Sequence, residues 1–567
     1  MKELPKQSFR DMSRGTIRTV QSSLVPRNSY MLGLNLDSDN ELGALISRLG
    51  NTIIGVECSA TYPCLGAHQH VGTSTVFAAF SDGTNNDIYD VSDGSKVLED
   101  DTKDSKTRFL SYLGATVRVN GVDANKYYNG TSWISDPTGA AFTAATNDFI
   151  TDVAHGLLNG DVVSFTTTDT LPAGLSLLTN YYVVEKTDDT FKVSLTKGGT
   201  AVDITDTGTG THTWAYWDPF DILDMPICEG LIEWKDRIYI YGADVGSGIL
   251  QYSSIADPDT RSISWNETGS AGTGQIEIEQ EDGGGDIEAL NKVPGYLLIF
   301  KTRTLKRWNG SSTFPEDMIN LGAPSQEATC YGRGMCFSFN YKGIFITNGG
   351  YPTRISKPID DFIKAIPTAN LSSVNSFCDE EHAYFYIGDV TINNDEYTNI
   401  VLKYNIDSQS WDIYSYYNEL KMMIKYVDSD GKEWIAAGDG DGQALKLNSG
   451  NTDYISTTAV FPIHWTYESQ DIEFEGMGEI KDIDRAKIFT RNVRNDCNFM
   501  ARANSNDPKN WDPKGVINDD IVDLKGLSMS GNYFNFKING FTDSGQVKLL
   551  GFEFPRQSTK IKDNTHE

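Results

Sequence analysis

The sequence lacks the features by which most membrane proteins and many enzymes are recognised. No apolar run approaches the ~18 residues that a membrane-spanning helix needs, and the N-terminal segment contains no apolar signal-peptide core. The GxSxG, GxxxxGK and HExxH patterns of nucleophile elbows, phosphate loops and metalloprotease helices are also absent. We therefore expect no membrane span, no enzymatic activity and no catalytic, cofactor-binding or metal-binding residue.

Basic residues and cysteines are scarce. The chain has 48 Lys and Arg against 78 Asp and Glu, a net charge of -30. This excludes an ordinary nucleic-acid binder, which needs basic residues to displace counterions from phosphates. An acidic wall around a DNA channel would instead repel the DNA and let it slide. The alternative is that the negative charge simply keeps free subunits soluble before assembly. The seven cysteines are an odd number scattered along the chain, which predicts reduced thiols and synthesis in a cytoplasm.

Long helical periodicities are rare, and short alternating runs dominate. With 567 residues, 52 glycines and 39% hydrophobic residues, the composition predicts several all-β domains with a large core. The pattern favours only two short helices, one at Glu41–Arg48 and the other within Pro358–Thr368.

One unit of strand, tight turn and strand is repeated. In Ile287–Ser311 the strands are Tyr296–Phe300 and Thr304–Trp308, closed by Asn309-Gly310. The corner at Asn129-Gly130 has the same pattern. Similar units recur every ~40–50 residues, which predicts an irregular β-propeller of about six to seven blades. A large sandwich of unrelated hairpins is the alternative. The other units are Thr73–Gly94, Lys106–Trp133, Leu231–Tyr252, Gly334–Ser356, Asn375–Tyr414 and Met422–Asn448.

Changes in composition divide the chain into five parts. Residues 1–57 are expected to form an extended N-terminal arm, residues 58–137 the first blades and residues 218–450 the remaining blades. Residues 138–217, rich in Thr, Asp and Gly, predict a small inserted β-domain. Residues 451–567 contain long alternating strands that predict a C-terminal antiparallel, sandwich-like β-domain.

A few segments invite a chemical interpretation that their spacing does not support. Cys58–His70 has two cysteines and His-Gln-His, but fits no zinc pattern; on a strand, His68 and His70 would simply share a face. The acidic runs Asp428–Gly431 and Gly438–Gly442 lack the glutamate of a calcium loop and indicate turns. Ser505–Trp511 resembles the aspartate box of sialidases without its glycine, and also indicates a turn. The glycosylation patterns at Asn129 and Asn309 are interpreted as turn residues.

Several stretches together resemble the tail nozzle, or tail hub, proteins of short-tailed bacteriophages. They are RGTIRTV…RLGNT at 14–52, ALNKVPGYLLIFKTRTLKRWNGSS at 289–312, GAPSQ…ISKPI at 322–359, TYESQ…AKIFT at 466–490, ARANSNDPKNWD at 501–512 and KLLGFEF at 548–554. The resemblance spans most of the chain outside 138–217. It implies a propeller subunit repeated as a ring, a hexamer, below the portal and its adaptor, and offers no catalytic residues.

The function implied is that of a structural virion protein of the phage tail, which continues the DNA channel, holds the packaged genome in place and lets it pass at ejection. Its partners would be other copies of itself, the portal-adaptor proteins, tail fibre or spike proteins, and genomic DNA that passes the lumen without specific binding. The acidic, glycine-rich Gly269–Gly285 is our candidate for a loop that gates the lumen. One alternative is a propeller that binds or cleaves carbohydrate in host recognition, since its 27 tyrosines and 10 tryptophans suit sugar stacking as well as cores. A cellular interaction scaffold is the other.

Overall fold

The computed structural model describes residues 7–19, 24–41, 43–58, 62–71, 73, 75–99, 102, 105–269, 272–278, 283–473, 480–504 and 510–555, and the backbone of 557–560. Strands predominate throughout, so the predicted all-β class is confirmed. The short helix expected within Pro358–Thr368 is present as α1 (Asp360–Ala365), between 3-10 turns at Lys357–Ile359 and Thr368–Ser373. Further 3-10 turns are Ala243–Val245 and Gln326–Ala328.

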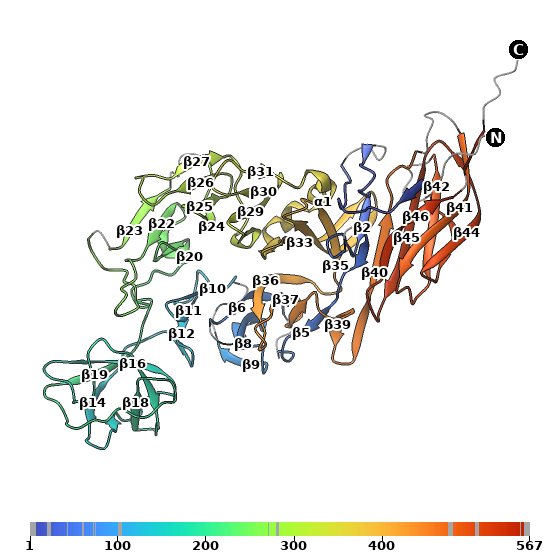
Figure 1. The fold of residues 1–567 in the computed structure, drawn as a ribbon. Coiled ribbons are helices and arrows are strands. Elements are labelled where there is room, and N and C mark those ends of the chain that lie inside the picture. The colour runs from blue at the N-terminus through green and yellow to red at the C-terminus, as the bar shows by residue number, and fades with distance from the viewer. Residues whose placement is uncertain are drawn as a thin grey trace, which may run out of the picture.

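Seven groups of four antiparallel strands build the body of the molecule (Figure 1). Sheet 1 contains β6 (Cys64–Gln69), β7 (Val76–Ser81), β8 (Asn86–Asp90) and β9 (Ser95–Leu98), and sheet 2 contains β10 (Arg108–Tyr112), β11 (Ala115–Val119), β12 (Lys126–Tyr128) and β13 (Trp133–Ile134). Sheet 3 contains β20 (Gly230–Trp234), β21 (Arg237–Tyr241), β22 (Ile249–Tyr252) and β23 (Gly274–Glu277), and sheet 4 contains β24 (Ile287–Val293), β25 (Tyr296–Lys301), β26 (Leu305–Trp308) and β27 (Glu316–Ile319).

The remaining three groups follow the same order. Sheet 5 contains β28 (Thr329–Gly332), β29 (Met335–Asn340), β30 (Gly343–Thr347) and β31 (Thr353–Arg354). Sheet 6 contains β32 (Asn375–Cys378), β33 (His382–Ile392), β34 (Asp395–Asn405) and β35 (Trp411–Ser415). Sheet 7 contains β36 (Leu420–Val427), β37 (Glu433–Asp439) and β38 (Ala444–Leu447), and takes its fourth strand from the arm.

Neighbouring sheets pack face to face through apolar side chains. The first strand of each sheet contacts the first strand of the next, in the series β6, β10, β20, β24, β28, β32 and β36, and β36 in turn contacts β6. Aromatic pairs mark several of these junctions: Phe77 of sheet 1 lies 5.2 Å from Trp133 of sheet 2, and Trp234 of sheet 3 lies 5.8 Å from Trp308 of sheet 4, between ring centroids. No sheet of this size buries its apolar face alone, so stability depends on this stacking.

The two predicted corners share one geometry. The side-chain oxygen of Asn129 accepts hydrogen bonds from the backbone N–H groups two and three residues ahead, at 2.8 and 2.9 Å. Asn309 does the same at 2.8 and 3.0 Å. Such Asx turns supply the chain reversal without needing a partner elsewhere in the molecule. The interpretation of both asparagines as turn residues is confirmed.

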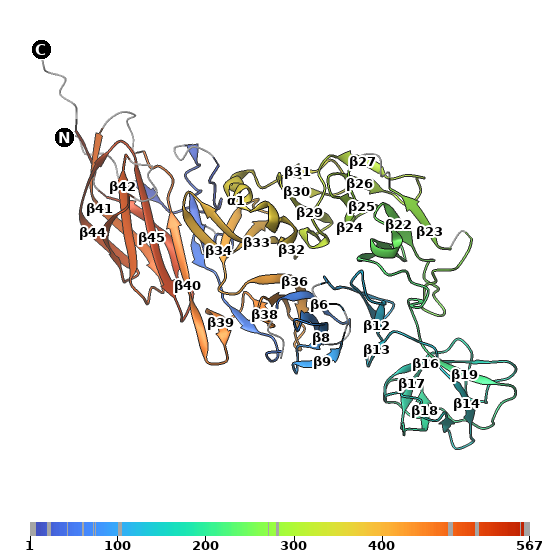
Figure 2. The same ribbon diagram turned by 180° about the vertical axis from the view of Figure 1, so that it is seen from behind.

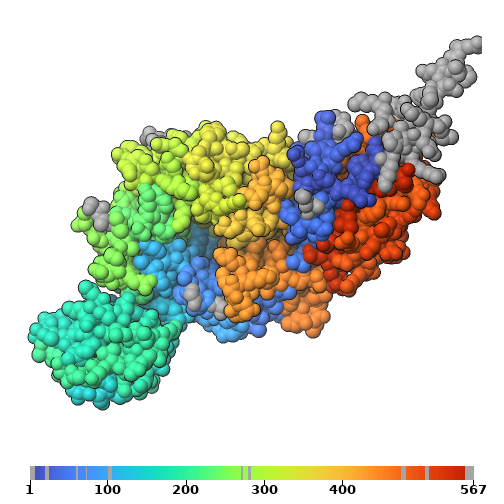
Figure 3. Space-filling view, viewed as in Figure 1, coloured from blue at the N-terminus to red at the C-terminus, as the bar shows by residue number. Residues whose placement is uncertain are grey.

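A closed six-stranded barrel separates sheet 2 from sheet 3 along the chain. Its strands are β14 (Ala141–Ala144), β15 (Ile150–Thr151), β16 (Val162–Thr167), β17 (Tyr181–Val184), β18 (Thr190–Ser194) and β19 (His212–Tyr216). The barrel is filled by its own core, which includes Phe165, Phe191 and Trp214. It projects as a separate lobe from the body, in cyan to green in Figure 3. At its base, Asp161 accepts a 2.6 Å hydrogen bond from Ser132 of the preceding turn.

Two large sheets pack against each other at the opposite end of the molecule. They are built from β39 (Thr452–Ser456), β40 (Ala459–Glu468), β41 (Ile480–Arg491), β42 (Cys497–Ala503), β43 (Asp512–Ile517), β44 (Ile521–Gly531), β45 (Phe534–Thr542), β46 (Lys548–Phe554) and β47 (Gln557–Lys560). Phe499 and Phe536 of one layer meet Ile488 and Phe552 of the other in the largest apolar core. One of these layers is continuous with sheet 6, which gives a single ten-stranded sheet.

The N-terminal arm joins these parts. β1 (Gln7–Phe9), β3 (Leu36–Asp37) and β4 (Leu45–Ser47) belong to the layer that contains β46, and β2 (Leu32–Leu34) lies between β35 and β40. β5 (Asn51–Ile53) is the fourth strand of sheet 7. Figure 2 shows the blue arm between the orange strands of sheet 6 and the red C-terminal strands. The helix predicted at Glu41–Arg48 is wrong, because Leu45–Ser47 pairs with β46 as a strand.

Candidate functional site

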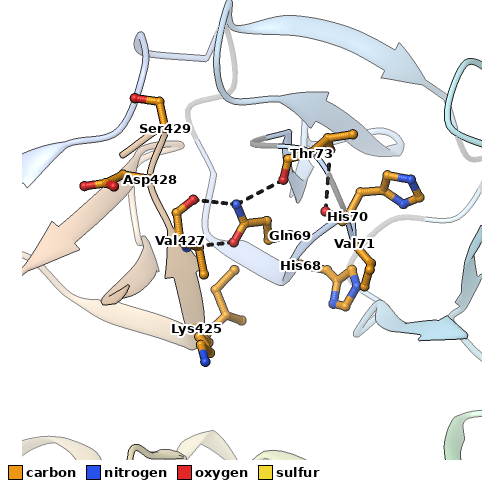
Figure 4. Close-up of a pocket in the computed structure, with 10 residues that line it drawn as sticks. His68, Gln69, His70, Val71, Thr73, Lys425, Val427, Asp428 and Ser429 are labelled. Carbon is orange, nitrogen blue, oxygen red and sulfur yellow. Dashed lines mark hydrogen bonds between the residues drawn. The ribbon is translucent and has the colours of Figure 1, made fainter. Parts of the chain in front are cut away.

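One cavity that the structure offers as a candidate site lies between sheet 1 and sheet 7, where β6 meets β36 (Figure 4). Its volume is about 740 Å³. The side-chain amide of Gln69 spans the junction: its nitrogen donates to the carbonyl of Val427 at 2.7 Å, and its oxygen accepts from the N–H of Val427 at 2.8 Å. Gln69 therefore pairs with sheet 7 as a backbone amide would. The lining residues are His68, Gln69, His70, Val71, Thr73, Ile424, Lys425, Val427, Asp428 and Ser429.

The two histidines of this cavity share a face, as predicted, and contact sheet 2. His68 Nε2 lies 2.7 Å from Ser111 Oγ, which lies 2.7 Å from Thr116 Oγ1, which lies 2.8 Å from His70 Nδ1. Burial lowers the pKa of His68 to about 4, with a smaller contribution from His70, and burial also lowers the pKa of His70. Both imidazoles are therefore neutral near pH 7, and the four side chains form a hydrogen-bond chain between two sheets.

This hydrogen-bond series shares one feature with the active site of a hydrolase but lacks the access to substrate that such a site needs. A neutral imidazole beside a serine hydroxyl is the start of a nucleophilic dyad. Ser111, however, is held by Thr116 on its other side and is not among the residues that line the cavity. The arrangement is suited to clamping sheet 1 to sheet 2.

The two cysteines do not join the histidines. Cys64 packs against sheet 7 in the core that contains Ala436, whereas His68 and His70 point to sheet 2. Burial raises the pKa of the Cys58 and Cys64 thiols to about 12, so both thiols are protonated near pH 7. The structure therefore separates the pair of cysteines from the pair of histidines.

One carboxylate cluster has the spacing of a metal site among the residues that the structure describes. Asp37 and Asp39 of the arm meet Asp412 of β35, with ligand oxygens within 4.8 Å of one another. The ammonium group of Lys403 already lies among them, 3.0 Å from Asp37 and Asp39 and 4.0 Å from Asp412. His382 Nε2 lies 3.2 Å from Asp39. We call these five residues the arm cluster.

The arm cluster is buried, and its charges depend on one another. Burial, reinforced by Asp37, raises the pKa of Asp412 to about 7. Burial alone would raise the pKa of Asp39. The hydrogen bond from His382 and the charge of Lys403 outweigh burial and lower that pKa to about 2. Burial alone would lower the pKa of His382. The nearby carboxylates outweigh burial and raise that pKa to about 9. Lys403 thus occupies the position where a cation would bind, and the cluster fastens the arm to sheet 6.

A second ionic cluster links the first strands of several sheets. Glu327, just before β28, accepts hydrogen bonds from Arg108 Nε and Lys106 Nζ, both at 2.9 Å. Arg108 also donates to the carbonyl of Glu229 before β20 at 2.5 Å. Burial opposes the charge of Glu327, but Arg108 and Lys106 prevail and lower its pKa well below the usual range. Side chains from sheets 2 and 5 thus meet a main-chain carbonyl that precedes sheet 3.

The other segments singled out in the sequence have structural roles or lie outside the described residues. Asp428 accepts backbone hydrogen bonds from Asp430 and Lys432 within its own turn, and Asp439 does so from Asp441 and Gln443, so the interpretation as turns is confirmed. Part of Gly269–Gly285 forms β23, paired with β22. Residues 270, 271 and 279–282 of that segment, and 505–509 of Ser505–Trp511, lie outside the description.

Comparisons with known proteins do not assign the chain to a family. No family model matches it, and no curated protein matches it by sequence. Among solved structures, Saccharomyces cerevisiae Sqt1 is 10% identical over 71% of this chain and 100% of its own, with a TM-score of 0.34. Kluyveromyces lactis Hsv2 is 8% identical, over 62% of this chain and 97% of Hsv2, with a TM-score of 0.26. The phage phi92 endosialidase is 11% identical, over 74% of this chain and 64% of the endosialidase chain, with a TM-score of 0.24. Similarity at this level carries no argument about function.

Membrane insertion through a helix has no support in the described part of the chain. The helices there are too short and too polar to cross a bilayer.

Proposed function

We propose that the chain is a structural subunit of a short-tailed phage tail, a nozzle protein that assembles into a ring around the path of the genome. The observation that carries the proposal is the closed series of contacts among seven four-stranded sheets, fused through the arm to a two-layered C-terminal end. We interpret the seven sheets as the blades of a propeller. Such a rigid, elongated body, together with the sequence resemblance, suits a repeated element of a tail.

The path for DNA in this proposal lies between copies of the chain. The centre of the ring of first strands holds the ionic cluster of Arg108, Lys106 and Glu327, which bridges sheets on different sides. Glu327 is only 8% exposed. Because Glu327 and Arg108 are largely buried and paired with each other there, an opening between them would leave both charges without partners at a high cost. A conduit therefore requires several subunits around a shared axis, and six is the number implied by the resemblance.

The charge of the chain agrees with this role. At -30, a subunit repels the phosphate backbone instead of holding it. The DNA would slide through the lumen without specific contacts. Above and below, the ring would meet portal-adaptor proteins and tail fibres or spikes, and the protein would reside in the tail of the virion. We propose no enzymatic activity.

Exposed edge strands at the C-terminal end are our candidates for the contacts between copies. β43 is the last strand of the ten-stranded sheet and β44 is the last strand of its partner layer. Edge strands offer unpaired backbone groups to another chain. Val516 on β43 and Ile521 on β44 are 42% and 62% exposed, although both are apolar. A ring contact across this edge would bury them.

The test is the assembly state of the purified protein. Mass photometry and negative-stain microscopy should show closed rings with a central opening wide enough for a DNA duplex, and duplex DNA should not bind to them. The double variant Val516→Asp/Ile521→Asp should remain folded and monomeric. Val153→Asp, at an apolar position of the barrel that is 74% exposed, should still form rings. If neither the free chain nor the chain mixed with a portal-adaptor assembly forms rings, the proposal is wrong.

A further inference from the structure

A row of aromatic side chains lies open to solvent beside sheet 6. Tyr417 follows β35, Phe461 and His464 lie on β40, and Phe541 lies on β45. Successive ring centroids are 5.0, 5.5 and 5.7 Å apart, so the four rings form one continuous strip. Tyr417 is 46% exposed and Phe461 is 36% exposed. Contiguous exposed apolar surface of this kind is typical of a binding site.

The row ends in a polar cavity. Tyr417 also lines a hollow of about 520 Å³ between sheets 6 and 7. Its lining also includes the carboxylates of Asp389, Glu419 and Asp441 and the amides of Asn370 and Asn399. Through Tyr417 the cavity and the row are continuous, so aromatic rings and hydrogen-bonding groups belong to one surface. We call it the aromatic cleft.

The aromatic cleft is held in shape by an irregular hairpin. The pairing of β33 with β34 is interrupted on both sides of Gly388, and Asn399 adopts a left-handed conformation with φ 50° in the middle of its strand. The backbone N–H of Asn399 donates to Asp389 at 2.8 Å, and its side chain donates to the carbonyl of Tyr417 at 2.9 Å. Bulges of this kind often adjust the direction of functional side chains.

Tyr417 is fixed from its other side as well. Its backbone N–H donates to the buried carboxylate of Asp453 at 2.9 Å. With both backbone groups engaged, the backbone of Tyr417 is held in place while 46% of the residue stays exposed. A ligand that stacks on this ring therefore need not order the loop first, which favours affinity.

We infer that the aromatic cleft binds a neutral oligosaccharide. Sugar rings have an apolar C–H face that packs on aromatic rings and a rim of hydroxyl groups that bind carboxylates and amides, the two kinds of surface present here. Three carboxylates against Lys421 alone give the cavity an excess of negative charge, which disfavours sugars that carry acidic groups. The row continues beyond the cavity, so a chain of several sugar residues fits better than a monosaccharide.

The inference is tested by titration of the full-length protein with cellohexaose, maltohexaose and N-acetylchitohexaose, measured by saturation-transfer NMR and calorimetry. At least one of these neutral chains should bind with a Kd of about 1 mM or tighter. A hyaluronan oligosaccharide of the same length, which is anionic, should not bind. Tyr417→Ala should weaken binding about three- to tenfold, as expected for one stacked ring, and Tyr417→Trp should preserve it.

Tyr341→Ala is the matched control. Tyr341 is 65% exposed in a turn of sheet 5, away from the aromatic cleft, and its removal should leave binding unchanged. The inference fails if no neutral chain binds, if Tyr417→Ala binds as well as the wild type, or if Tyr341→Ala loses as much affinity. It also fails if Tyr417→Ala abolishes ring assembly without changing sugar binding, because the row would then be a contact between copies. The inference is independent of the nozzle proposal, since ring assembly and sugar binding are measured separately.

Discussion

The ion pair between Arg48 of the arm and Asp453 of β39 offers a sharp test of how the arm is held. The two side chains are each 1% exposed, and they are joined by two parallel hydrogen bonds of 2.8 and 2.6 Å. The remaining guanidinium donors bind the Asn35 side chain and the carbonyls of Leu49 and Ser415. All five N–H groups therefore have partners, the condition under which a buried arginine is tolerated.

Replacing Arg48 by methionine keeps most of the volume but leaves Asp453 buried without its counter-charge. We expect a loss of about 3–5 kcal/mol, the usual cost of removing one partner of a buried pair. A molecule of several domains does not unfold in one step. The loss of stability should therefore be measured locally, from the hydrogen exchange of backbone amides in β5 and β39. Protection of their amides should fall about 150- to 4,000-fold, which is the same free energy expressed as an equilibrium constant.

Two further variants make the measurement decisive. The ion pair between Arg333 and Asp407 has a similar distance, 2.6 Å, but side chains that are 43% and 71% exposed, so Arg333→Met should cost only about 0.5 kcal/mol. The double variant Arg48→Met/Asp453→Leu should regain most of the protection, because no uncompensated charge remains. If Arg48→Met lowers protection no more than Arg333→Met does, the reasoning about buried charge is refuted.

Three other predictions concern the arm cluster and the thiols. The raised pKa of His382, about 9, means that its contribution to stability is complete below pH 6.5 and is lost as the pH rises through 9. About 3 kcal/mol should disappear over that interval in hydrogen exchange of the arm, and His382→Gln should remove most of this dependence, leaving the smaller loss that Asp412, with a pKa of about 7, contributes between about pH 6.5 and 8. Lys403→Ala leaves three carboxylates facing one another, so Ca²⁺ should raise the thermal midpoint of this variant and leave the wild type unchanged; equal responses would contradict the role of the ammonium group. All seven cysteines are free and buried, so Ellman's reagent should react with them only after denaturation, and rapid reaction of the native protein would contradict their burial.

Local patterns in the sequence predicted the features that depend on neighbours in the chain. The strands at Tyr296–Phe300 and Thr304–Trp308, the Asx corners at Asn129 and Asn309, and the shared face of His68 and His70 all follow from alternation and turn chemistry within a few residues. Such short-range rules need no knowledge of the fold.

Features that join distant segments could not be predicted in the same way. Glu41–Arg48 fits a helix by local spacing, but Leu45 pairs with Leu549, and this long-range contact decides the conformation. The arm cluster and the Arg48–Asp453 pair join residues hundreds of positions apart, so no spacing rule reveals them. The aromatic cleft likewise combines the loop after β35 with β40 and β45.

The placement of the arm has a consequence for synthesis on the ribosome. β1, β2 and β4 leave the ribosome hundreds of residues before their partners β40 and β46 are made. At about 5–20 residues per second, the arm waits roughly 25 to 100 s before its partners exist. During that time β1 lacks its partner, and β4 has only its hairpin partner β3. A chain truncated before β46 would leave β1 and the outer edge of β4 without backbone partners, so it would expose pairing edges that complete folding covers.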